Sequence, residues 1–207
     1  MRKITEIYEQ YKIMPNLVLH QLRVAAVVKQ ICESFVTPVE AEPVVIAGLL
    51  HDMGNIIKAD LDQNLFTLSN EEIIFWKEEQ KLCIGKYGND TSNATATVAK
   101  EIGVTESVQK LIEHNDFKFI CDIAQSSSVG KKILKYADLR VGPYGVISLD
   151  ERFVDIKKRY GELLQDDRRD CAEEIENQIF AHSKLKPEDI TDESVRNIIE
   201  ELKNYEL

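Results

Sequence analysis

The chain has 207 residues, of which 43% are hydrophobic and 30% charged, and its formal net charge is -10 at pH 7. This balance is typical of a globular protein with a substantial core, and it argues against disordered or fibrous sequence. The negative charge repels nucleic-acid phosphates and anionic lipid, which disfavours a general nucleic-acid binder. A small anionic substrate remains compatible with this charge, because a bound metal ion can invert the local field.

Helix signals recur along the chain, and the 9 glycines and 5 prolines are too few for a turn-rich β-sandwich. Capping-box patterns at Thr37, Ser69 and Ser148 predict helix starts, and Gly88 and Gly103 predict helix ends. Apolar residues repeat at spacings of three and four without period-two alternation, so the predicted class is all-α. The expected helices span residues 3–13, 16–35, 38–53, 70–87, 92–102, 106–115, 129–141, 149–165, 168–182 and 192–204.

These helices divide into two expected units. Residues 1–145 are expected to form a helical bundle, which ends at the sharp loop Gly142–Gly145. Residues 146–207 are more polar and are expected to form a C-terminal helical appendage packed on the bundle as a peripheral layer or lid. The basic run 157–159 alternates with acidic residues, which favours a solvated helix face over an anion site.

The spacing of the cysteines and the length of the apolar runs indicate the cellular compartment in which the protein is expected. Cys32, Cys83, Cys121 and Cys171 lie far apart without a CxxC pair, so we expect reduced thiols rather than a disulfide framework. The N-terminal residues are charged and amphipathic rather than a secretory signal, and the longest apolar stretch, 44–50, is too short to cross a bilayer. We therefore expect a soluble cytoplasmic protein that does not act in a membrane.

Four polar side chains fall where a helical core should be apolar: His20, the adjacent pair His51 and Asp52, and Asp138. An unpaired buried carboxylate costs several kcal/mol, so each of these groups needs a partner. Taken singly, His20 fits a core histidine and His51-Asp52 fits a helix end. Two imidazoles and two carboxylates around one divalent cation satisfy one another together, which favours a shared metal site.

Asp138 taken singly has a simpler explanation as well. It could pair with Lys135 or Arg140 in a surface ion pair of little energetic value. The joint pattern of four groups outweighs these separate explanations, so metal binding is the preferred hypothesis.

Three segments resemble one family. HQLRVA at 20–25, AGLLHDMG at 47–54 and YADL at 136–139 resemble the H…HD…D pattern of HD-domain metal-dependent phosphohydrolases, over about residues 16–141. The resemblance implies an all-α HD-domain-like bundle that hydrolyses phosphate esters or anhydrides, often of nucleotides. It also implies a divalent ion (Mn, Fe, Co, Ni, Mg or Zn) held by His20, His51, Asp52 and Asp138.

The sequence departs from the family at two places. Two-metal members carry further histidines between the HD doublet and the last aspartate, whereas here only His114 lies in that interval. We therefore expect one metal ion, with His114 as a candidate outer ligand or substrate contact. Some nucleotidase relatives carry Glu three residues after the HD aspartate, where this chain has Asn55, so the resemblance leaves the general base open.

The remaining roles follow from charge and spacing. Asp52 is the candidate proton acceptor as well as a ligand. Arg23 shares a helix face with His20 and is a candidate phosphate clamp, with a salt bridge to Asp52 or Glu33 as the alternative. Lys58 and Arg140 are further candidates for stabilising transition-state charge.

The leading hypothesis is hydrolysis of a phosphomonoester or phosphoanhydride of a small molecule, a nucleotide above all, by a metal-activated water. One alternative is a catalytically weak, nucleotide-binding regulatory module of the HD type. The other, ranked last because it needs more ligands, is an iron-dependent HD oxygenase. The expected partner is a small phosphorylated substrate rather than bulk nucleic acid, and a homodimer is compatible with the sequence.

Overall fold

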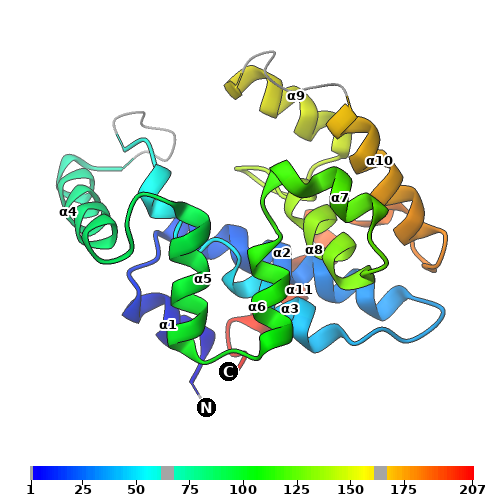
Figure 1. Ribbon diagram of the computed structural model, residues 1–207, viewed down its shortest axis with the longest axis horizontal. Coiled ribbons are helices and arrows are strands. Elements are labelled where there is room, and N and C mark those ends of the chain that lie inside the picture. The colour runs from blue at the N-terminus through cyan, green and yellow to red at the C-terminus, as the bar shows by residue number, and fades with distance from the viewer. Residues whose placement is uncertain (1, 62–67, 161–166) are drawn as a thin grey trace.

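A computed structural model describes residues 2–61, 68–160 and 167–207 (Figure 1). Its α-helices are α1 (Ile4–Gln10), α2 (Pro15–Ser34), α3 (Ala41–Leu50), α4 (Asn70–Tyr87), α5 (Thr91–Ile102), α6 (Glu106–Glu113), α7 (Ile120–Gln125), α8 (Val129–Arg140), α9 (Leu149–Tyr160), α10 (Asp167–Phe180) and α11 (Asp192–Leu202). Short 3₁₀ helices are η1 (Asn55–Lys58), η2 (Phe117–Phe119) and η4 (Pro187–Asp189). Isolated bridges, but no strands, occur within these ranges, so the all-α prediction is confirmed.

Several helix boundaries lie where the capping residues predicted them. The amide of Glu72 donates to Ser69 Oγ, and the amide of Glu151 donates to Ser148 Oγ, each at 3.2 Å. Gly103 ends α5 in the left-handed region at φ 88°, which residues with a Cβ rarely adopt. The predicted end of α9 at residue 165 lies outside the described residues.

One predicted helix start is wrong, and one helix was not predicted. The capping box at Thr37 does not form, and α3 begins only at Ala41. The reason is tertiary, because the preceding residues extend alongside a distant segment, with the Val36 amide donating to the His182 carbonyl at 2.9 Å. The helix that was not predicted is α7, which has six residues, follows η2 directly and has no side-chain cap that could have indicated its start.

The core is built around α2, which packs against α3, α8 and α11. A Cβ on Gly48 of α3 would lie 3.0 Å from the Ala25 Cα of α2, so glycine here lets the two backbones approach closely. Buried residues from both predicted units, such as Leu134 and Ile175, belong to one hydrophobic cluster. The C-terminal helices therefore pack on the bundle, whereas the boundary at residue 145 stays a prediction.

The two ends of the chain lie together (Figure 1). The Arg2 amide donates to the Leu207 carbonyl at 2.8 Å, and the Leu207 amide donates to the Arg2 carbonyl at 2.9 Å. The Gly142–Gly145 loop is a sharp turn, as predicted, because the Gly142 amide donates to the Gly145 carbonyl at 2.8 Å. No helix of the described residues is long and apolar enough to span a membrane.

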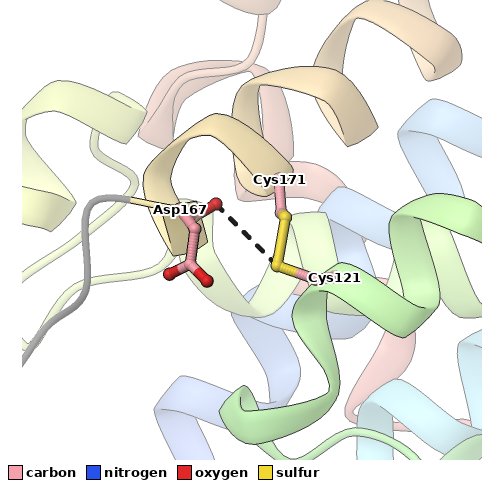
Figure 2. Close-up of a disulfide and its surroundings, with 3 residues drawn as sticks. All are labelled: Cys121, Asp167 and Cys171. Carbon is pink, nitrogen blue, oxygen red and sulfur yellow. Dashed lines mark hydrogen bonds between the residues drawn. A yellow bond between two sulfur atoms is a disulfide. The ribbon is translucent and has the colours of Figure 1, made fainter.

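The expectation of four reduced thiols is wrong. Cys121 of α7 and Cys171 of α10 form a disulfide across 50 residues of sequence, beside the Asp167 carbonyl (Figure 2). Sequence spacing gave no sign of it, because the pairing depends on the packing of α10 against α7. Disulfides persist mainly in oxidising surroundings, so this bond does not support the expected reduced state. Cys32 and Cys83 are free.

Candidate metal centre

Three helices bring the four predicted ligands to one point. His20 lies on α2, His51 and Asp52 follow the last turn of α3, and Asp138 lies on α8. His20 Nε2 lies 3.6 Å from Asp52 Oδ2 and 3.4 Å from Asp138 Oδ1. His51 Nε2 lies 3.7 Å from Asp52 Oδ1 and 3.5 Å from Asp138 Oδ1. Both imidazoles thus face both carboxylates.

These separations match the donor spacing around a small cation. Bonds of about 2.0–2.2 Å to a tetrahedral ion place neighbouring donor atoms roughly 3.3–3.6 Å apart. The four nitrogen–oxygen distances, 3.4 to 3.7 Å, are close to that spacing and too long for ordinary hydrogen bonds. One donor atom each from His20, His51 and Asp52 also lies within 4.8 Å of the other two.

His51 supplies the sharpest test of whether a cation fits. Its side chain is 1% exposed, and its Nδ1 donates to the Gly48 carbonyl at 2.9 Å, which leaves a lone pair on Nε2 in the neutral ring. Nε2 has no hydrogen-bond partner among the described residues, although it faces two carboxylates. A lone pair directed at anionic oxygens is unfavourable unless a proton or a metal ion lies between them. The donor set therefore fits a bound divalent cation.

The electrostatics of the metal-free site agree. Burial alone would lower the pKa of His51, but the facing carboxylates of Asp52 and Asp138 outweigh it and raise that pKa to about 9. Burial would raise the pKa of Asp138, but Lys135 and the two imidazoles hold it well below its usual range. The site thus favours positive charge, which a proton on the imidazole supplies when no metal ion is bound.

Neighbouring polar groups hold the candidate ligands in place. Lys135 Nζ donates to Asp138 Oδ2 at 3.0 Å, and Asn115 Nδ2 donates to the same oxygen at 3.3 Å. Lys135 is only 2% exposed, so this pair is not the weak surface ion pair considered from the sequence. The Asp52 amide donates to Gln21 Oε1 at 3.3 Å, which fixes the backbone of the HD doublet. Such contacts orient ligands and tune the site.

The candidate ligands lie in the wall of a cleft of about 650 Å³, a volume typical of small-molecule sites. Of the predicted substrate-contacting residues, Arg23 and Lys58 line this cleft. Arg23 Nε lies 3.6 Å from Asp192 Oδ1 of α11, rather than pairing with Asp52 or Glu33.

The structure does not bring two other candidates to the cleft. Arg140 is 4% exposed, and its guanidinium donates to Tyr136 Oη and to the carbonyls of Ile147 and Ile190, so it ties α8 to the C-terminal segment. His114 is exposed, and its Nδ1 bonds the Lys110 carbonyl at 2.9 Å. The cleft is lined instead by the neighbouring residue, Asn115.

The cleft also contains cationic residues that were not predicted as site residues. These are Lys135 together with Arg152, Arg159 and Arg168. The three arginines come from α9 and α10, outside the segments that carry the HD pattern. The i, i+7 spacing of Arg152 and Arg159 indicates a shared helix face, but only the fold shows that this face meets the cleft.

Comparisons with known proteins give one match. The family model described as HD domain matches residues 17–140, which contain all four candidate ligands. Neither the curated proteins nor the solved structures contain a match to the chain.

Proposed function

The chain belongs to the HD-domain family, and we propose that it is a metal-dependent phosphohydrolase that cleaves a phosphate ester or anhydride of a small molecule, a nucleotide above all. The observation that carries this proposal is the buried Nε2 of His51, which faces two carboxylates without a hydrogen-bond partner among the described residues. His20, His51, Asp52 and Asp138 would hold the ion. When bound, it would acidify a water molecule and neutralise charge on a phosphoryl oxygen.

The chain's own residues would orient the substrate and move the proton. Arg23 and Lys58 line the cleft and can donate to phosphoryl oxygens. Each Asp52 oxygen faces a different imidazole, so a carboxylate that binds through one oxygen keeps the other to accept the proton of the attacking water. Asp52 can therefore serve as the base although Asn55 stands at the family's glutamate position.

The cleft has room for the organic part of a nucleotide as well. Leu17, Ile112, Phe117 and Ile156 give it an apolar surface on which a nucleoside can pack. This supports a nucleotide over a bare phosphate ester.

A phosphatase screen tests the proposal. The full chain, loaded in turn with each divalent metal, is assayed on nucleotides, sugar phosphates and p-nitrophenyl phosphate. Asp138→Ala should lower turnover by roughly two orders of magnitude or more, because it removes a ligand. Asp122→Ala, which removes an exposed carboxylate of α7, should leave turnover unchanged. Nucleotide binding without product would contradict the hydrolase and favour the regulatory module.

A further inference from the structure

The charge of the cleft is opposite to that of the chain. The whole chain carries -10, yet among the described residues six cationic side chains and three carboxylates line the cleft. Two of those carboxylates, Asp52 and Asp138, face the imidazoles and are assigned to the ion. Cationic side chains therefore outnumber carboxylates among the described residues that line the cleft, and a concave wall with an excess of cationic groups concentrates anionic ligands. The cationic residues are Arg23, Lys58, Lys135, Arg152, Arg159 and Arg168.

Half of these cations come from helices outside the family match, which ends at residue 140. Arg152 and Arg159 lie seven residues apart on α9, with Ile156 between them on the same cleft-facing side. Asp155 pairs with both guanidinium groups, at 3.3 Å from Arg152 Nη1. One carboxylate thus aligns the two guanidinium groups of α9.

Arg168 completes the group from the first turn of α10. Its guanidinium stacks over the Phe117 ring, with the central carbon 5.4 Å from the ring centroid. The next residue, Arg169, differs because it pairs with Asp150 and Glu173 and does not line the cleft. Stacking on the Phe117 ring orients the Arg168 guanidinium, which suits it to an anionic ligand.

The disulfide fixes the same part of the wall. Figure 2 shows the bond between Cys171 of α10 and Cys121 of α7. Cys171 lies three residues after Arg168, and Cys121 lies just beyond η2, which carries Phe117. The bond therefore holds the arginine-bearing end of α10 against the segment on which Arg168 stacks. Pre-organised groups of this kind lose less entropy when a ligand binds.

We propose that Arg152, Arg159 and Arg168 form a subsite for a second phosphate, which makes the substrate class compounds with two or more linked phosphates rather than monoesters. This rests on the proposed function, which places the first phosphate at the metal centre. The water oxygen bonds to that first phosphorus, and the bridging phosphorus–oxygen bond breaks. Its electron pair stays on the departing phosphate, which the arginines hold, and the water proton passes to Asp52.

Calorimetric binding of two probes tests the subsite. The probes are inorganic phosphate and imidodiphosphate, a nitrogen-bridged pyrophosphate analogue, each titrated into the full chain with excess Mg²⁺. Wild type should bind imidodiphosphate more tightly. The double variant Arg159→Gln/Arg168→Gln should weaken imidodiphosphate binding about tenfold or more, as expected for lost charge-assisted hydrogen bonds, and phosphate binding less than about threefold.

The matched control removes two charges from the same helix. Lys157 and Lys158 are exposed and do not line the cleft, so Lys157→Gln/Lys158→Gln should leave both affinities within about threefold. If the arginine double variant does not fold, Arg159→Lys/Arg168→Lys replaces it. This variant should also lose more affinity for imidodiphosphate than for phosphate, because lysine cannot bind phosphate in a bidentate manner. Equal affinity of wild type for the two probes, or equal losses in arginine and control variants, would overturn the subsite.

Hydrolysis of p-nitrophenyl phosphate separates this proposal from the proposed function. That monoester needs only the metal centre. If its hydrolysis is absent while the arginine-dependent preference for imidodiphosphate persists, the hydrolase proposal fails and the subsite stands. If hydrolysis is present while the preference is missing, the subsite fails alone.

Discussion

Replacing Lys135 by methionine should destabilise the metal-free protein and tighten metal binding. Lys135 is 2% exposed and its ammonium lies 3.0 Å from Asp138 Oδ2. Breaking a buried ion pair by removing one partner costs about 3–5 kcal/mol. Asp138 is 20% exposed and keeps the Asn115 amide, so we expect a loss of about 2–3 kcal/mol in the free energy of unfolding.

A bound cation changes this result, because it supplies Asp138 with the positive charge that Lys135 provided. The loss should then fall to about 1 kcal/mol in the metal-saturated protein. By linkage, the metal must bind the variant more tightly by the difference, about 1–2 kcal/mol, which is about five- to thirty-fold in the dissociation constant.

Urea unfolding of chelator-treated and metal-saturated protein measures the two losses, and Mn²⁺ titration calorimetry measures the affinity. Lys132→Met is the matched control, since Lys132 is a half-buried lysine of α8 that does not line the cleft. It should change neither quantity. Equal losses with and without metal, or weaker metal binding by Lys135→Met, would refute the assignment of Asp138 as a ligand.

Three further predictions concern the fold around the site. The chain unfolded without reductant should show two reactive thiols, Cys32 and Cys83, and four after reduction. Burial raises the pKa of Cys32 to about 12, so this thiol should react only after unfolding. Four reactive thiols before reduction would rule out the disulfide. Gly54→Val should cost about 2 kcal/mol in urea unfolding, because a Cβ there lies 2.6 Å from the Thr91 carbonyl oxygen, and unchanged stability would contradict that close approach. Arg140→Met should cost about 3 kcal/mol, because the Ile147 and Ile190 carbonyls lose the donor that the guanidinium supplies, while KM for p-nitrophenyl phosphate stays unchanged. A raised KM at normal stability would return Arg140 to the site.

The sequence was most informative where several local signals agreed. The HD pattern identified four side chains on α2, just after α3 and on α8, and the structure brings them together because these three helices pack against one another. Ser69 and Ser148 marked helix starts because their hydroxyls satisfy amides only three residues away. Signals of this kind need no knowledge of the rest of the fold.

Features that depend on distant packing were not predictable. Thr37 carried the same capping pattern, but residues 35–36 pair with 182–183 and keep the chain extended. Cys121 and Cys171 gave no spacing signal, because their pairing depends on how α10 packs on α7. The basic run ending at Arg159 indicated a solvated face, yet Arg159 lines the cleft. Charge patterning shows which face of a helix is polar, and only the fold shows what that face meets.

The most direct test of the metal centre is the metal content of purified protein after dialysis against each divalent ion, measured by elemental analysis. We predict about one ion per chain in wild type, its loss in Asp52→Asn, and its retention in Asp122→Asn, in which the carboxylate removed is exposed on α7. Wild-type protein without metal, or equal metal content in Asp52→Asn and wild type, would contradict it.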